Sequence, residues 1–499
     1  MKDNKLVKNI VIGFGAQAIA LILGIIVPRF ILDSYGSDTN GILSTVTQIF
    51  SYLALLEAGV SQSAQMALYK PIVEKDEEQI NVVLSSANAY FRKLTIPYGF
   101  GVILLAMILP FVLKTDLAKE TIIGIVLLEG ISEVCNFYFI QVRSCLLGIL
   151  GKSYINNGIT LLSRILIYMI KIVLACMHAN ILLLQLGFVL IAFIKIIIYC
   201  MYIKRKYPRV QFHGYNKQYK LKDRNSYVLS EIAWTVFSST DMIVLSIFLN
   251  AKMSSVYSVY NMIFSSVNAL VSAVYYSVCY VLGYAYHENI EKYKRTHDSF
   301  MSAFVGTMTI LISIAYVLTI PFVKLYTQGI RDVEYIYPLL PLLFCLVQLL
   351  SWSRFVSGNL TSLAGYAKQT SYISFMEAII NIVLSVTLVN RFGISGVVAA
   401  TVTALPVKVI WCNYIADKKV MHRSIKKTVL ILGANYALFF GIVMINHFYQ
   451  PGIDSFPGFF KWGVILTLMI STVGVGLNCL VNRELVLTMG NILKIHKKQ

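Results

Sequence analysis

Charged residues are scarce in this chain. Asp, Glu, Lys and Arg make up 13% of its 499 residues, whereas hydrophobic residues make up 57%. Soluble domains carry about 25% charged residues, and one water-soluble core cannot hide so much apolar surface. The composition therefore excludes an ordinary soluble protein and predicts a polytopic membrane protein.

Sequence motifs of enzymes and metal sites are also lacking. The chain contains no Gly-rich phosphate loop, no His-Glu-x-x-His and no Gly-x-Ser-x-Gly. Its eight cysteines include no Cys-x-x-Cys, and its seven histidines form no cluster. These absences argue against a zinc site and a disulfide framework. We therefore expect neither an enzyme nor a bound cofactor.

Long apolar segments are abundant. A membrane-spanning helix needs about 20 mostly apolar residues, and fourteen segments meet that condition. They are residues 9–32, 41–64, 94–114, 120–142, 154–177, 180–203, 226–249, 256–283, 299–323, 334–357, 370–390, 393–416, 426–447 and 460–481. The sequence thus predicts an all-α polytopic membrane protein with about 14 transmembrane helices.

Basic residues lie mostly on one side of these predicted spans. With the N-terminus inside, cytoplasmic loops and their flanks hold 30 of the 43 Lys and Arg residues, and external loops hold eight. This asymmetry follows the positive-inside rule and predicts that both termini are cytoplasmic. The net charge of +19 is then explained by topology and contact with anionic membrane lipids, so no nucleic-acid partner is expected.

A repeat runs through the first twelve predicted spans. Tyr69 and Tyr286, like Glu74 and Glu291, are 217 positions apart. A unit with an even number of spans begins on the same side of the membrane as its copy, so the two six-span repeats are parallel. Parallel repeats are typical of transporters, which bind their substrate between the two halves. We expect four parts: a six-helix lobe (1–203), a basic cytoplasmic link (204–224), a second six-helix lobe (225–417), and two extra helices with a basic cytoplasmic tail (418–499).

Ionisable residues inside predicted spans are candidate site residues, because charge in a bilayer is costly. Glu129 and Glu133 share one helical face, as do Arg164 and Lys171. Arg164 and Lys171 are candidates for binding an anionic substrate. Internal pairing, of Glu133 with Arg164 or Lys171, is the alternative.

Two further acidic residues belong to this set. Glu57 lies in the second span, and Asp241 lies within "FSSTDMIVLSIFLN". Asp241 is interpreted either as a counter-charge for a basic residue or as a carboxylate that binds a proton or a sodium ion. Glu129, Glu133 and Glu57 are candidates for the same coupling or counter-charge role.

A polar stripe follows one face of the eighth span. It comprises Asn261, Ser265, Asn268 and Ser272, and Tyr275 extends it. Such side chains could replace the hydration of sugars in a substrate cavity. Small polar residues also hold helices together in lipid, so the stripe has a structural interpretation as well.

Four stretches resemble those of a known family: "LLEAGVSQSAQMALYKPI", "STDMIVLSIF", "VYSVYNMI" and "NRFGISGVVAATV". They are similar, in order and spacing, to the Wzx-type polysaccharide flippases of the multidrug/oligosaccharidyl-lipid/polysaccharide exporter superfamily. The resemblance covers nearly the whole chain. It implies two six-helix lobes in a V with two additional helices.

The resemblance also implies a function. The cargo would be an undecaprenyl-diphosphate-linked oligosaccharide, carried from the inner to the outer leaflet of a bacterial plasma membrane by alternating access. Further expected partners are membrane lipids, a polysaccharide polymerase and glycosyltransferases. The family has no strict catalytic motif, so no site residue is transferred from it.

Three other functions stay open. A cation-coupled multidrug exporter would use the acidic residues, although Arg164 and Lys171 argue against it. A lipid-linked peptidoglycan-precursor flippase differs only in its cargo. A membrane glycopolymer polymerase or ligase would normally need a large external loop, and the longest one predicted here, 448–459, is short.

Overall fold

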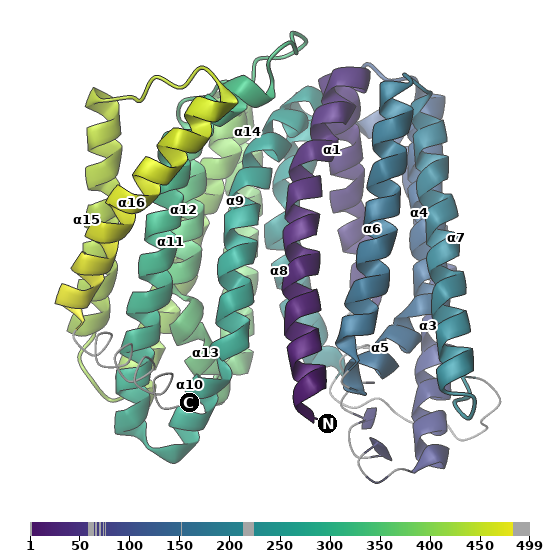
Figure 1. Ribbon diagram of the computed structural model, residues 1–499, viewed down its shortest axis with the longest axis horizontal. Helices are drawn as coiled ribbons and strands as arrows, with labels where there is room; N and C mark the ends of the chain where they lie inside the picture. Colours follow the sequence, from purple (N-terminus) through teal and green to yellow (C-terminus); the bar gives the residue numbers. More distant parts are fainter. Residues whose placement is uncertain are drawn as a thin grey trace. The chain divides into compact units, whose positions relative to one another are not determined.

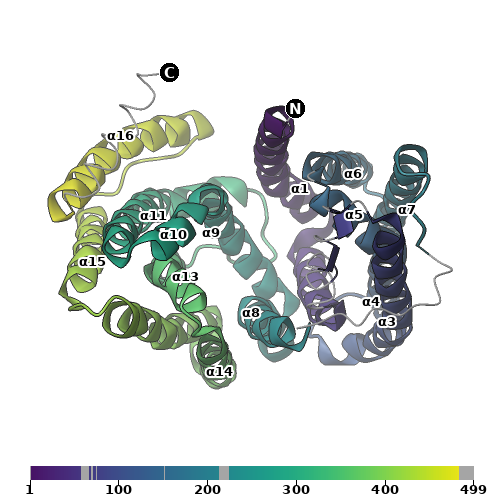
Figure 2. The ribbon, with the colours of Figure 1, turned by 90° about the horizontal axis from the view of Figure 1, so that it is seen from below.

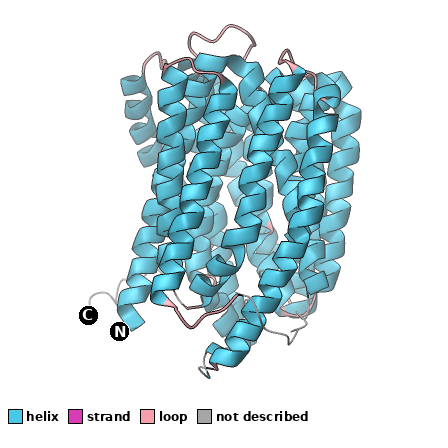
Figure 3. Cartoon of the chain, turned by 90° about the vertical axis from the view of Figure 1, so that its right-hand side faces the viewer, coloured by secondary structure: helices cyan, strands magenta, loops and turns pink. Residues whose placement is uncertain are grey.

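The computed structural model describes residues 2–57, 76–150, 152–212 and 224–482, together with residues 64, 67, 68, 71, 72 and 74. Every regular element in this described part is a helix, and it contains no strand (Figure 3). Ten of the helical segments found there are long and apolar enough to cross a membrane. The chain is therefore an all-α, multi-pass membrane protein, which confirms the fold class predicted from its composition.

The chain divides into two compact units by its internal contacts. Unit 1 comprises Met1–Ser255 with Ile330–Val333, and unit 2 comprises Val256–Gly329 with Glu334–Gln499. Helix α8 (Arg224–Val244) packs against α1 (Lys2–Leu53) and so lies in unit 1. The predicted second lobe began at residue 225, one helix earlier than this division. Residues 213–223 of the predicted link lie outside the described residues.

Unit 1 is built from long helices that pack side by side (Figure 1). Besides α1 and α8, its long helices are α3 (Glu77–Val112), α4 (Lys119–Cys135), α6 (Ser153–Cys176) and α7 (Ile181–Lys206). α1 contacts α6, α6 contacts α7, α7 contacts α4, and α4 contacts α3. Viewed end-on, these helices follow one another around the unit (Figure 2). This order brings side chains of α4, α6 and α7 together.

Short irregular elements interrupt the long helices of unit 1. A 3-10 turn (Ala54–Glu57) follows α1. A π-helical turn (Asn136–Ile140) joins α4 to α5 (Gln141–Ile149), and another (Leu245–Leu249) ends α8. π-Helical turns are rare and frequently occur at functional sites. They lie directly after the segments that carry Glu133 and Asp241.

Glycines separate spans that run together as single helical segments. Gly36, with φ 78° and ψ 175°, divides α1, and Gly393, with φ 57° and ψ −140°, divides α14 (Ala367–Tyr414). Glycine adopts positive φ without a steric penalty, so each glycine marks a sharp break between two helices. Each of the fourteen predicted spans consequently lies on described helix over most of its length.

Unit 2 is arranged around α11 (Ile290–Tyr326). Its other elements are α9 (Ala251–Val278), α10 (Tyr280–Glu288), α12 (Leu340–Ser353), α13 (Phe355–Leu363), α14, a π-helical turn (Ile415–Val420), α15 (Lys426–Phe448) and α16 (Phe456–Val481). α11 packs against α10, α12, α15 and α16. The two extra C-terminal spans are thus docked on the central helix of unit 2.

Exposed apolar side chains show how the surface of unit 1 is adapted to lipid. In α3 they form one stripe, Ile96, Phe100, Ile103, Met107 and Phe111, and the first and last are 75% and 74% exposed. Spacings of three and four residues place all five on one helical face. A face this apolar needs hydrocarbon around it, as expected of a membrane-spanning helix.

Candidate functional site

Side chains of α4, α6 and α7 form a charged cluster inside unit 1. Gln185 of α7 is 2% exposed, and its Nε2 donates a hydrogen bond to Glu129 Oε2 of α4 at 3.2 Å. Lys171 of α6 interacts electrostatically with the Glu129 carboxylate. The Oε1 atom of Gln185 is buried and has no hydrogen-bond partner among the described residues. One amide and one ammonium therefore flank the same carboxylate.

A second layer of charges lies one helical turn further along α4. Glu133 accepts a long, 3.5 Å hydrogen bond from Asn136 and interacts electrostatically with Lys195 of α7. Lys195 also interacts with the Arg164 guanidinium of α6. Glu133 lies as far from the first residue of α4 as Lys195 lies from the first residue of α7. The distance along each helix is about 20 Å. That depth is near the middle of a bilayer-spanning segment.

The cluster carries one more positive than negative charge. Its basic residues are Arg164, Lys171 and Lys195, and its acidic residues are Glu129 and Glu133. Within the described part of the chain, no nitrogen–oxygen contact of ion-pair length joins any two of the five. Arg164 is exposed, whereas the other four are half-buried. Lys171 and Lys195 thus interact with Glu129 and Glu133, respectively, without being locked to them in close ion pairs.

Asp241 lies on another side of unit 1, where α8 meets the end of α1. It is 5% exposed. Beside it, the hydroxyls of Ser51 and Ser239 are 2.9 Å apart, and those of Tyr52 and Thr240 are 2.6 Å apart. Asp241 interacts electrostatically with Tyr52. The carboxylate is therefore buried beside a seam of hydroxyl groups between two helices.

We expect Asp241→Asn to lower transport about tenfold, the effect of losing an interaction of roughly 1.4 kcal/mol, while insertion changes little. Asparagine keeps the shape but removes the charge. Export should be measured for both forms across external pH and sodium concentration. Loss of a pH or sodium response indicates ion coupling, and a uniform decrease indicates a counter-charge. Unchanged export under every condition contradicts both roles.

The residues of the predicted polar stripe lie on α9 in unit 2, and they differ in whether their side chains are packed inside the protein. Asn268 Oδ1 accepts a hydrogen bond from Trp352 Nε1 at 2.9 Å. Tyr275 is 1% exposed, and its ring packs edge-on against Phe304 and Phe355. Asn261 and Ser272 are half-buried, and Ser265 is exposed. Asn268 and Tyr275 therefore contribute to helix packing, which leaves the other three as candidates for contact with a substrate. The side chain of Glu57 lies outside the described residues.

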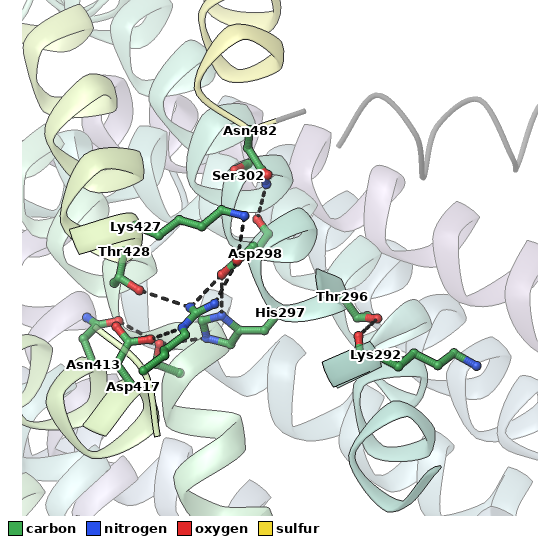
Figure 4. Close-up of polar contacts among 12 residues, drawn as sticks. Lys292, Thr296, His297, Asp298, Ser302, Asn413, Asp417, Lys427, Thr428 and Asn482 are labelled. Atoms are coloured by element: carbon green, nitrogen blue, oxygen red, sulfur yellow. Dashed lines mark hydrogen bonds and ion pairs between the residues drawn. The ribbon is translucent and has the colours of Figure 1, made fainter. Parts of the chain in front are cut away.

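Two further groups of charged residues in unit 2 are held together by short ionic contacts. Arg354 Nη1 contacts both carboxylate oxygens of Glu377, at 2.6 and 2.7 Å, and both residues are buried. Asp298 of α11 accepts hydrogen bonds from Arg423 at 2.7 and 2.8 Å and lies 2.9 Å from Lys427 of α15 (Figure 4). Short contacts of this kind satisfy the charges within the protein. We interpret both groups as structural.

Sequence reasoning missed one member of the unit 1 cluster. Gln185 stands in the apolar run "ILLLQLGF", and a lone uncharged residue there attracts no attention. A search for polar residues on helices that pack against Glu129 would have found Gln185.

Comparison by sequence gives no assignment, since no protein-family model matches the chain and no curated protein matches it. Comparison by structure gives clear matches. The lipid II flippase MurJ in an inward closed conformation has a TM-score of 0.64 at 14% identity, covering 93% of this chain and 97% of MurJ. A multidrug resistance MATE family transporter of the MOP superfamily, in an inward-facing conformation, has a TM-score of 0.61 at 13% identity, covering 82% and 98%.

A third match is a MOP superfamily transporter from Pyrococcus furiosus Vc1, described as having reverse polarity of its binding pocket. Its TM-score is 0.56 at 13% identity, and the match covers 84% of this chain and 96% of the transporter. Identities this low establish architecture rather than substrate. The chain has the fold of the MOP superfamily transporters.

Proposed function

We propose that this protein is a flippase for an undecaprenyl-diphosphate-linked oligosaccharide, which it moves from the inner to the outer leaflet of a bacterial plasma membrane for cell-surface polysaccharide synthesis. The fold supports transport as the general activity. The charged cluster of unit 1 is the observation that favours an anionic cargo. It has three basic and two acidic groups and no close ion pair joining them, an arrangement suited to an anionic substrate.

The chemistry of a diphosphate matches this cluster. A diphosphate cannot cross hydrocarbon unaided, and compensating charge is far more effective at low dielectric than in water. Arg164 offers a planar, forked donor that suits phosphate oxygens. Lys171 and Lys195 would add point charges, and the Gln185 amide could accept a hydrogen bond from a sugar hydroxyl. The lipid tail could remain in the bilayer during transfer.

Alternating access is the proposed mechanism. The cargo would bind from the cytoplasmic side, and a change of conformation would then open the site to the outside. No chemical bond is made or broken. Arg164, Lys171 and Lys195 would neutralise the negative charge of the diphosphate, and Glu129 and Glu133 would reduce the net positive charge of the cluster. Asp241, which lies apart from the cluster, is proposed to act as a counter-charge for a basic residue elsewhere or to couple the change to a proton or a sodium ion.

A cation-coupled multidrug exporter is the second candidate function. Likeness to a MATE family transporter favours it, as do the carboxylates of Glu129 and Glu133. An exporter of cationic drugs needs negative charge at its binding site, whereas the cluster has a surplus of basic groups. A peptidoglycan-precursor flippase fits the cluster as well as the main proposal does, because its cargo is also a lipid-linked diphosphate.

The proposed function is tested by the cargo that the purified protein moves. Proteoliposomes should be loaded with either an undecaprenyl-diphosphate-linked oligosaccharide, a lipid-linked peptidoglycan precursor or a fluorescent cationic drug. We expect transfer of the first substrate between leaflets at least tenfold faster than in protein-free vesicles. Cells lacking the protein should accumulate the same lipid-linked sugar on the cytoplasmic leaflet. Drug transport without lipid transfer would overturn the proposal.

A further inference from the structure

A cavity of about 330 Å³ lies at one end of unit 1, apart from the charged cluster. It is lined by Ile72, by the start of α3, by α5 and by the end of α7 with the segment that follows it. This end carries the basic run Lys204-Arg205-Lys206, which closes α7. The positive-inside rule therefore predicts that the cavity opens at the cytoplasmic surface of the membrane.

The wall formed by the segment after α7 is fixed by two buried asparagines of α3. Asn81 Nδ2 donates to Arg209 O at 3.2 Å, and Asn81 Oδ1 accepts from Gln211 N at 2.9 Å. Asn88 Nδ2 donates to Phe212 O at 3.1 Å. Both asparagines are at most 5% exposed. Because the backbone is held at three points, the cavity is preformed.

The lining combines apolar walls with a basic rim. Leu146, Leu150 and Ile80 provide apolar surface, while Lys206 and Arg209 are exposed at the edge. Next to Lys206, the ring of Tyr207 lies 4.8 Å from the Lys152 ammonium. Apolar surface beneath a basic rim at a membrane surface suits a ligand with an anionic head and an apolar body.

One acidic residue, Glu77, forms an ion pair with a basic residue of the rim. Glu77 Oε1 lies 3.1 Å from Arg209 Nη1, with side chains 60% and 79% exposed. Exposed ion pairs of this kind contribute little to stability because water and salt screen them. A phosphate group can therefore displace Glu77 from Arg209, and removal of the Glu77 charge should favour that exchange.

We propose that this cavity binds the headgroup phosphate of an acidic phospholipid of the cytoplasmic leaflet, with Lys206 and Arg209 on the phosphate and the first carbons of the acyl chains against Leu146 and Leu150. The volume is at the small end of the range of about 300–1,000 Å³ for ligand pockets, so it suits a headgroup rather than a whole lipid. This lipid is not the transported cargo, and the site is independent of the proposed function.

The test measures phosphatidylglycerol binding to the full-length protein in detergent micelles by native mass spectrometry, with phosphatidylcholine as the neutral reference. We expect Lys206→Gln with Arg209→Gln to weaken phosphatidylglycerol binding at least tenfold, and Glu77→Gln to strengthen it about threefold. Lys204→Gln with Arg205→Gln is the matched control, since it removes two charges from the same helix end at residues that do not line the cavity. It should change binding less than twofold.

Three results would overturn the proposal. Equal binding of phosphatidylglycerol and phosphatidylcholine would exclude recognition of the anionic head. An equal loss for Lys204→Gln with Arg205→Gln would show that surface charge in general, and not the cavity, attracts the lipid. Displacement of the lipid by inorganic phosphate at equal concentration would show a free-phosphate site without a lipid component. The Glu77→Gln variant keeps the proposal testable even if the double variant misfolds, because a gain of binding cannot result from loss of the fold.

Discussion

Export is expected to fall at least tenfold when Arg164 and Lys171 are both replaced by alanine, although the protein still inserts and accumulates. In the parent, three basic and two acidic residues leave the cluster with one positive charge. The double substitution leaves Lys195 with Glu129 and Glu133, so the net charge becomes negative. A diphosphate would then meet repulsion at low dielectric, where charge interactions are strong. Surface polysaccharide per inserted protein is the measurement.

Matched variants separate this effect from a general loss of positive charge. Lys93→Ala with Lys204→Ala removes the same charge from two exposed positions outside the cluster, and export should be nearly unchanged. Exchange of the two basic types, Arg164→Lys with Lys171→Arg, should retain part of the activity. Normal export by the double alanine variant would remove both residues from the site. Improved efflux of a cationic drug by that variant would favour the multidrug exporter instead.

The positions of the spans follow from the sequence because bilayer thickness limits the apolar length of a helix. Predicted spans 154–177 and 426–447 differ by one residue at most from α6 and α15. Polar extensions were not predicted. α3 begins at Glu77, well before the apolar segment 94–114, and the Asp76 side chain caps it by accepting a hydrogen bond from Gln79 N. Hydropathy cannot detect a helix that continues into water.

The members of the charged cluster were largely predictable, but their neighbours were not. Glu129, Glu133, Arg164 and Lys171 stand out because charge within a span is costly. Pairing of Glu133 with Arg164 or Lys171 was the alternative interpretation. In the structure Glu133 interacts with Lys195, and Lys171 interacts with Glu129. Periodicity places residues on a face of their own helix. Which helix that face meets depends on rotation and packing order, which one sequence does not specify.

A buried ion pair in unit 2 provides the largest expected effect on stability. Glu377 and Arg354 are 2% and 8% exposed, and their contacts of 2.6 and 2.7 Å satisfy both carboxylate oxygens. Removing one partner of such a pair leaves an uncompensated buried charge and typically costs about 3–5 kcal/mol. Here the cost should depend on which partner is removed, because Lys408 also interacts with both residues.

We expect Glu377→Gln to be more destabilising than Arg354→Gln. Loss of Glu377 leaves Arg354 and Lys408 as two like charges without a carboxylate, and the free energy of unfolding should fall by about 3–5 kcal/mol. Loss of Arg354 leaves Glu377 with Lys408, so the decrease should be about half as large. Thermal unfolding of the detergent-solubilised protein measures this order, with Glu120→Gln at an exposed position as the control. In the Glu377→Gln background, Lys408→Met should restore part of the lost stability, because the effects of interacting residues are not additive. Equal destabilisation by both single substitutions, without rescue by Lys408→Met, would show that Lys408 does not share the Glu377 carboxylate.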